Sequence, residues 1–171
     1  MSSKNGSRSA SHAPSSFRVE VAGKPGYEGA AGAQVAAQFA HLGMALPAEV
    51  RVCPIYEFTG RLTPREVEQA AKDLLADPVT QEFRVGESGM SPAFMMAPHW
   101  RVEVWLKPSV SDPHESSVRK ALKDLGLPAP ERVRCGTVYK IVGRLSAAQV
   151  ERAARKILSN PVIHRYVITA P

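Results

Sequence analysis

Two segments of the chain alternate between apolar and polar residues. The first is FRVEV at Phe17–Val21, and the second is WRVEVWL at Trp100–Leu106. A period of two residues is typical of a β-strand that buries one of its faces. A Lys-Pro pair follows each segment, and proline cannot extend a β-ladder from a central position. The pattern therefore predicts one strand at the start of each half of the chain.

A segment with helical spacing follows each predicted strand. In the second half Asp112 is placed as an N-cap, Pro113 stands at the first helical position, and Gly126 is placed to end the helix. The apolar positions between them follow i, i+3, i+4, i+7 spacing: Val118, Ala121, Leu122 and Leu125. The first half lacks the Asp-Pro start, and its entry through Gly29 and Gly32 is expected to fray.

The rest of each half also has a regular pattern. Val133–Leu145 is rich in Val, Ile and Tyr, and it predicts either one bent strand or two strands around Gly136-Thr137. A second helix starts at a capping box, Thr63–Glu66 in the first half and Ser146–Gln149 in the second. A proline ends each of these helices, and final strands are predicted at 80–85 and 163–169. The unit is therefore β-α-β(β)-α-β, an α+β layer with its helices on a small antiparallel sheet.

The two halves align without a gap at an offset of 83 positions, so that Phe17 falls on Trp100. This indicates an internal duplication. We divide the chain into a disordered tail at 1–16, repeat one at 17–85, a linker at 86–99 and repeat two at 100–171. The repeats are expected to clasp face to face about an approximate twofold axis, as an intramolecular dimer. Whether their strands join into one sheet is left open.

Composition narrows the class of protein. The chain has 171 residues, 44% hydrophobic residues, a net charge of +6 and a pI near 9.6. No apolar run approaches the roughly 20 residues that cross a bilayer, and the N-terminus lacks the apolar stretch of a signal peptide, so we expect a cytoplasmic protein. Cys53 and Cys135 form no CxxC motif, and the five histidines show no ligand spacing. We therefore assign no metal-binding residue.

Catalytic motifs are also missing from the sequence. It has no GxSxG, HExxH or Walker A pattern, and the carboxylates fall mainly at helix caps and on polar faces. We assign no catalytic and no cofactor-binding residue, and we expect a binding or assembly role.

The second half resembles the PurS family, the small subunit of phosphoribosylformylglycinamidine (FGAM) synthase, and the resemblance extends to the first half through the repeat. It rests on VEVWLKPSVSDPHESSVRKALKDLG, on VRCG and on LSNPVIHRYVI. The matching positions are Leu106, Lys107, Val110, Asp112, Pro113, Leu125, Gly126, Val133, Arg134, Gly136, Asn160, Pro161, Val162, Ile163 and Tyr166. The family pattern has glycine at Ser109, Gln-Gly at His114-Glu115 and lysine at Thr137, and the first half lacks the Asp-Pro and Gly-Lys.

The resemblance implies a non-catalytic subunit that bridges the synthetase (PurL) and glutaminase (PurQ) subunits of a ligase in purine biosynthesis. That complex converts FGAR to FGAM with ATP, Mg2+ and glutamine as amide donor, while this chain itself holds no cofactor. The resemblance also implies two fused units, which can associate further as a homo-oligomer, and membranes and nucleic acid are not the expected partners. The candidate partner-contact residues are Lys107, Pro108, Asp112, Pro113, Arg134, Gly136, Asn160 and Pro161.

Two alternatives remain open from the residues alone. The positive charge is compatible with a nucleic-acid-binding module, for which Trp105 and Tyr139 are the candidate stacking residues. A tandem α+β protein can also sense a small molecule between its two repeats. Salt-dependent retention on a polyanion would test the first alternative, and a thermal shift with ligands would test the second.

Overall fold

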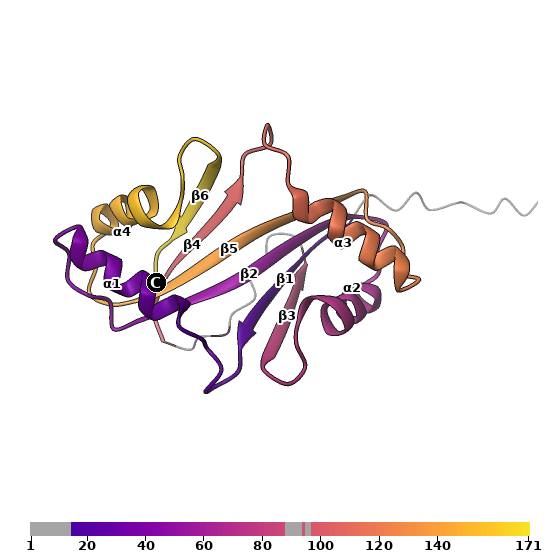
Figure 1. Cartoon of the computed structure of the whole chain (residues 1–171), viewed down its shortest axis with the longest axis horizontal. Helices are drawn as coiled ribbons and strands as arrows, with labels where there is room; N and C mark the ends of the chain where they lie inside the picture. The colour runs from indigo at the N-terminus through magenta and orange to yellow at the C-terminus, as the bar shows by residue number, and fades with distance from the viewer. Residues whose placement is uncertain (1–14, 88–93, 95–96) are drawn as a thin grey trace, which may run out of the picture.

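The computed structural model describes residues 15–87, 94 and 97–171. They form one antiparallel sheet of six strands in the order β3-β1-β2-β5-β4-β6, with the helices on one of its faces (Figure 1). The strands are β1 (Ser15–Gly23), β2 (Glu49–Gly60), β3 (Gln81–Glu87), β4 (Trp100–Leu106), β5 (Arg132–Val142) and β6 (His164–Thr169). The helices are α1 (Ala31–His41), α2 (Pro64–Ala70), α3 (Pro113–Asp124) and α4 (Ala147–Ala153). Helices α2 and α4 continue as π-helical stretches, η1 (Ala71–Leu75) and η2 (Ala154–Leu158).

The predicted α+β class and the order of elements in each half are confirmed. The middle segment of each half is one long strand, so the single-strand alternative is the correct one and the alternative of two strands around Gly136 is wrong. Strand β1 begins at Ser15, inside the predicted tail, and β3 runs to Glu87, inside the predicted linker. The rest of the predicted tail, residues 1–14, and most of the predicted linker lie outside the described residues.

The helix ends follow the chemistry of the sequence. Thr63 and Ser146 each accept a hydrogen bond from the N3 backbone N–H, while the Glu66 and Gln149 side chains bind back to the N-cap N–H. Gly126 adopts a φ of +73° just after α3, a left-handed conformation that favours glycine. Local sequence therefore determines where these helices begin and end.

A local twofold axis passes through the centre of the sheet. Strands β2 and β5 pair antiparallel, and Pro54 pairs with Thr137, its own equivalent at the offset of 83. The pairs on either side exchange under the same operation, because Val52 pairs with Tyr139 and Tyr56 with Cys135. The outer registers repeat as well: Phe17 pairs with Phe58, and Trp100 pairs with Ile141. The halves therefore join edge to edge in one continuous sheet, and the expectation of a face-to-face clasp is wrong.

Each half supplies a helix to the hydrophobic core of the other half. Leu122 of α3 belongs to the cluster built on Phe17, Val19 and Val67 of the first half. In the same way, Phe39 of α1 belongs to the cluster built on the second half, which includes Val102, Val150 and Ala153. Figure 1 shows the resulting pairs, with α1 beside α4 and α3 beside α2. Neither half therefore completes a core with its own helices.

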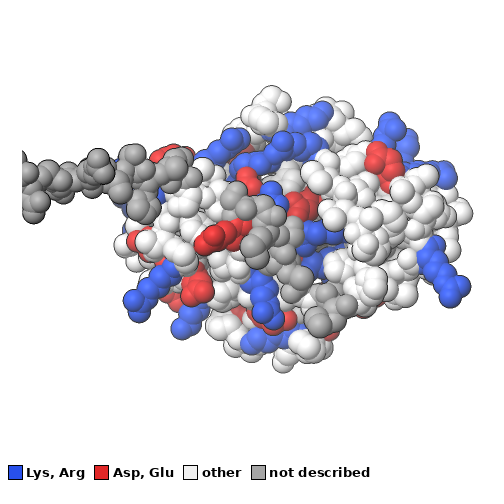
Figure 2. Space-filling model, turned by 180° about the vertical axis from the view of Figure 1, so that it is seen from behind, with Lys and Arg blue, Asp and Glu red and all other residues white. Residues whose placement is uncertain are grey.

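Figure 2 shows Lys, Arg, Asp and Glu side chains near the centre of the helix-free face. Beneath that surface, buried charges lie at the junction between the halves. Arg18 pairs with Glu103 at 3.2 Å, and the symmetry-related Arg101 pairs with Glu20 at 2.8 Å. Lys140 pairs with the second oxygen of Glu20, and both side chains are 0% exposed. A fully buried charge requires such partners, because its removal from water is otherwise costly.

The same network continues toward the end of β5. Glu57 binds Arg18 at 3.0 Å and Arg134 at 3.1 Å, and Phe94 lies 5.0 Å from the Lys140 ammonium, measured to the ring centroid. Because most of these pairs join the first half to the second, the network ties the halves together on the face opposite the helices.

We expect Leu122→Ala to destabilise the whole chain. Leu122 is 2% exposed and fills the core of the other half, so truncation should lower the free energy of unfolding by about 2–5 kcal/mol. Leu125→Ala, at a 44% exposed position next to the same helix, should change it by about 0.5 kcal/mol. Urea unfolding followed by circular dichroism measures both variants. Two separate transitions, with only one shifted, would contradict the shared cores.

The environment of Glu103 leads us to expect that the protein is less stable in acid. Burial alone would raise the pKa of Glu103, but the hydrogen bond and charge of Arg101, with Arg18, hold it below its usual value of 4.5. A lowered folded-state pKa contributes stability above the unfolded pKa, and this is lost as the pH falls through the folded pKa. The free energy of unfolding should therefore decline below about pH 4.5.

The matched variants are Glu103→Gln and Glu68→Gln, the latter at an exposed position of α2. We expect Glu103→Gln to be less stable at neutral pH and to show a shallower decline in acid, whereas Glu68→Gln should follow the parent curve. The same acid slope in all three proteins would count against this assignment.

Candidate functional site

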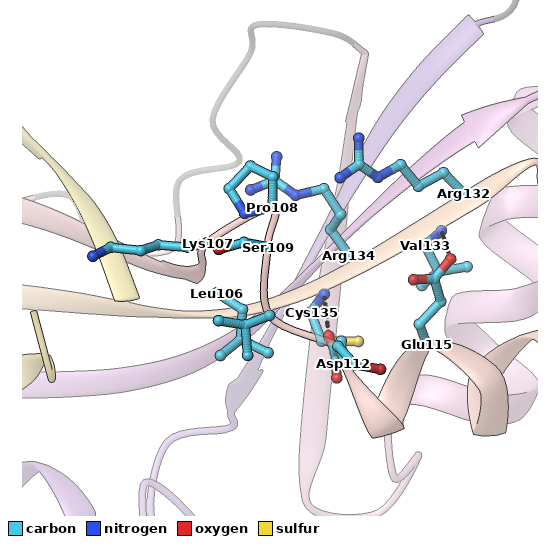
Figure 3. A pocket seen from close by; sticks show the side chains of 12 residues that line it. Leu106, Lys107, Pro108, Ser109, Asp112, Glu115, Arg132, Val133, Arg134 and Cys135 are labelled. Atoms are coloured by element: carbon cyan, nitrogen blue, oxygen red, sulfur yellow. Dashed lines mark hydrogen bonds between the residues drawn. The ribbon is translucent and has the colours of Figure 1, made fainter. Parts of the chain in front are cut away.

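A pocket lies where β4 separates from β5. Their pairing ends at Trp105 and Gly136, and the chain then turns through residues 107–112 before α3 begins. The space between this loop and the free edge of β5 has a volume of about 230 Å³ (Figure 3). Four of the predicted contact residues line it: Lys107, Pro108, Asp112 and Arg134.

Two carboxylates hold the free edge of β5. The Cys135 N–H donates to Asp112 Oδ2 at 3.3 Å, and the Val133 N–H donates to Glu115 Oε1 at 3.5 Å. Asp112 Oδ1 also accepts from the His114 N–H at 2.9 Å, which caps α3. Asp112 therefore links the start of α3 to the strand edge, so the helix start and the pocket share one side chain.

The cysteine at this edge is not suited to nucleophilic chemistry. Burial raises the pKa of Cys135 to about 12, and the nearby Asp112 carboxylate adds to the rise. The thiol is therefore protonated at neutral pH. Among the described residues no group of three or more His, Cys, Asp and Glu could hold a metal ion.

Arg134 connects the pocket with the charged network. Its Nη1 donates to Glu57 at 3.1 Å, and its guanidinium lies 4.9 Å from the centroid of the Trp105 ring. Burial lowers the pKa of Arg134, and the charges of Arg165 and Arg132 lower it further. The buried Nη2 atom has no hydrogen-bond partner among the described residues.

Gly136 makes room for the Trp105 ring. A Cβ at this position would lie 2.6 Å from the ring and 2.8 Å from the Val104 carbonyl oxygen. Gly136, with Pro113 and Asp112, also lines an adjoining groove of about 480 Å³ on the helix-bearing face. The glycine therefore has a packing role within this chain.

The end of the 107–112 loop away from α3 brings together Lys107, Asn160 and Pro161. The Lys107 ammonium donates to the Pro161 carbonyl at 2.6 Å, and Figure 3 shows its side chain pointing away from Arg132 and Arg134. Asn160 Oδ1 accepts from the Val162 N–H at 3.0 Å. Lys24 makes the same bond to Pro78 at 2.6 Å in the first half. Asn160 and Pro161 thus approach the pocket only through Lys107.

The first half packs differently at the equivalent place. Gly32, the equivalent of Glu115, is buried in α1, and a Cβ there would lie 1.9 Å from the Val50 carbonyl oxygen. Helix α1 therefore lies directly on β2, whereas a glutamate side chain stands between α3 and β5. Gly32 thus permits close packing of α1, a role that the sequence pattern did not indicate.

Sequence reasoning missed Glu115, Arg132 and Arg165 as parts of this region. Their equivalents at the offset of 83 are Gly32, Glu49 and Glu82. A change in the class of residue between otherwise matching repeats was therefore the signal that could have identified them.

The nucleic-acid alternative loses one of its two stacking candidates. Trp105 is 3% exposed and sits between Arg18 and Arg134, so the expectation that it stacks on bases is wrong.

Within the described part of the chain, the helices are all too short or too polar to span a bilayer.

We expect Gly32→Ala to destabilise the protein, although alanine normally stabilises a helix relative to glycine by about 1 kcal/mol. The new methyl group would overlap the Val50 carbonyl, and relief of such overlap typically costs about 1–3 kcal/mol. Gln34→Ala, at an exposed position of the same helix, should be neutral or slightly stabilising. Thermal unfolding of both variants decides the sign. Stabilisation by Gly32→Ala would show that α1 does not lie directly on β2.

Comparison with known proteins agrees with the pattern in the second half. Residues 99–171 match the family model for PurS, phosphoribosylformylglycinamidine (FGAM) synthase. The PurS subunit of phosphoribosylformylglycinamidine synthase from Synechocystis is 28% identical over 87 residues, which cover 48% of this chain and 87% of the relative.

Solved PurS structures resemble one half of the chain. B. subtilis PurS has 29% identity and a TM-score of 0.40, and the match covers 44% of this chain and 99% of that one. PurS from Methanocaldococcus jannaschii has 28% identity and a TM-score of 0.40, covering 44% and 96%. Residues 99–171 of this chain are thus similar to the PurS family of phosphoribosylformylglycinamidine synthase.

Proposed function

We propose that this chain is the PurS component of FGAM synthase, which joins the synthetase (PurL) and glutaminase (PurQ) subunits. The complex would convert FGAR to FGAM with ATP, Mg2+ and glutamine, and those ligands would be held by the partner subunits. The observation that carries the proposal is the match of residues 99–171 to the PurS family.

The fusion of two repeats about a local twofold axis supports a bridging role. A continuous sheet with shared cores fixes the distance and orientation between the two ends of the molecule. A rigid element of this kind can hold two partner active sites in one arrangement, which favours transfer of ammonia between them. Fusion also makes the pairing of the halves intramolecular, with an effective concentration in the millimolar range.

The turn before β6 and strand β6 itself offer exposed apolar residues for docking. Val162, Ile163 and Val167 are 77%, 36% and 55% exposed, in the turn before β6 and on this edge strand. The equivalents at the offset of 83 are Val79, Thr80 and Arg84, of which only the valine is apolar. Exposed apolar side chains of this kind mark interaction surfaces, so we place the main partner contact on the second half.

Reconstitution tests the proposal. The purified chain alone should show no synthase activity, and its addition to the synthetase and glutaminase subunits of the same organism should restore glutamine-dependent formation of FGAM. Light scattering during size-exclusion chromatography should show all three proteins in one complex. Equal activity with and without the chain would overturn the proposal.

A matched pair of variants tests the placement of the contact. Val162→Asp should weaken assembly by about tenfold or more, because it puts a charge into an apolar contact. Val79→Asp changes the equivalent 69% exposed residue of the first half and should leave assembly unchanged. Equal losses in the two variants would assign the contact to both ends.

A further inference from the structure

The pocket beside β5 has a positively charged side that the proposed function does not use. Arg132 and Arg134 lie two residues apart on the same strand, so their side chains leave the same face of the sheet. Figure 3 shows the two guanidinium groups next to each other, close to Pro108. Arg165 of β6 pairs with Trp105 in the sheet, which places it on this face as well.

The positive charge here exceeds what the carboxylates neutralise. The network at the junction contains four cations, Lys140, Arg101, Arg18 and Arg134, against three carboxylates, Glu20, Glu103 and Glu57. Arg132 and Arg165 add two positive charges, and neither forms an ion pair with another described residue. Asp112 and Glu115 across the pocket add two negative charges, so the surplus of one positive charge remains and lies on the side of the arginines. Like charges held this close favour binding of an anion.

Arg134 has an unused donor at this place. Its Nη1 binds Glu57, but its buried Nη2 has no partner among the described residues. A buried donor normally has an acceptor, because an unpaired one is unfavourable. Burial lowers the pKa of Arg134 most, and repulsion from Arg165 and Arg132 lowers it further. An anion between the three groups would relieve this repulsion.

The acidic residues of the pocket lie on its other side. Asp112 and Glu115 are engaged with backbone N–H groups of β5 and α3, and in Figure 3 they lie across the pocket from the two guanidinium groups. Ser109 and Ser111 also line the pocket, and their hydroxyl groups can donate hydrogen bonds. The guanidinium side is thus free to accept an anion.

We infer that this pocket binds the phosphate group of a small phosphorylated molecule through Arg132 and Arg134, with Arg165 adding positive charge beside it. Forked guanidinium donors match the oxygens of phosphate, and three positive charges suit a dianion better than a single carboxylate. A space of about 230 Å³ between a loop and a strand edge admits a small molecule rather than a polymer. The first half has Glu49, Arg51 and Glu82 at the equivalent positions, so the site exists once per chain.

The test is a titration of the isolated full chain, so its outcome does not depend on the proposed function. Inorganic phosphate and AMP are added at constant ionic strength, with adenosine as the neutral control, and amide signals are followed by NMR. Phosphate and AMP should shift signals of residues 109–111 and 132–135 saturably, with a Kd on the order of 1 mM. Adenosine should leave them unchanged.

Charge-reversal variants distinguish binding at a specific site from an effect of the net charge of the protein. Arg132→Glu and Arg165→Glu introduce the residue type of the first half at exposed positions, and each should weaken binding by about tenfold or more. Arg152→Glu makes the same charge change on α4 and should weaken it by less than about twofold. Equal weakening by all three variants, or no saturable shift with phosphate, would overturn the inference. Saturation by a glutamate-rich peptide but not by phosphate would also overturn it, in favour of a protein partner.

Discussion

The exchange of helices between the two halves is the interaction on which the rest of the structure depends. Leu122 of α3 fills the core of the first half, and Phe39 of α1 fills the core of the second. A unit of about 70 residues buries only a modest fraction of its surface by itself, and here each unit would also lack one helix of its core. The pairing of β2 with β5 is therefore a condition for folding, and the two halves form one cooperative body.

The exchange of helices determines which residue positions can differ between the two halves and which cannot. The core positions remain apolar in pairs at the offset of 83, as for Val19 and Val102 or Val67 and Val150. On the helix-free face the paired charges are kept as well, as for Arg18 and Arg101, but other positions have diverged, so that Glu49 corresponds to Arg132 and Ala22 to Trp105. The symmetric core thus supports an asymmetric surface, and the pocket with its arginines lies in the second half alone because only that half carries these replacements.

Local pattern predicted most of the elements, because strand alternation, helical stripes and caps are properties of short segments. It did not predict the edge-to-edge sheet or the exchanged helices, since these depend on contacts between residues far apart, such as Arg18 with Glu103. The role of Lys107 was also hidden, because its bond to the Pro161 carbonyl is visible only once the turn is folded. Among the pocket residues, the sequence predicted Asp112 and Arg134. It did not predict the position of α3, which brings Glu115 to β5.

Buried charges at the junction select the register of β2 on β5, which apolar residues would not do. A slip of β2 along β5 by two residues would keep every side chain on its own face, so an all-apolar junction would discriminate poorly between registers. Such a slip would separate Glu20 from Lys140 and Glu57 from Arg134, and it would leave buried charges without partners. The network thus selects one register. The contact of Arg134 with Trp105 belongs to the separate register of β4 on β5. The junction reaches the pocket through Glu57 of β2, which holds the Arg134 side chain only in the observed register of β2 on β5.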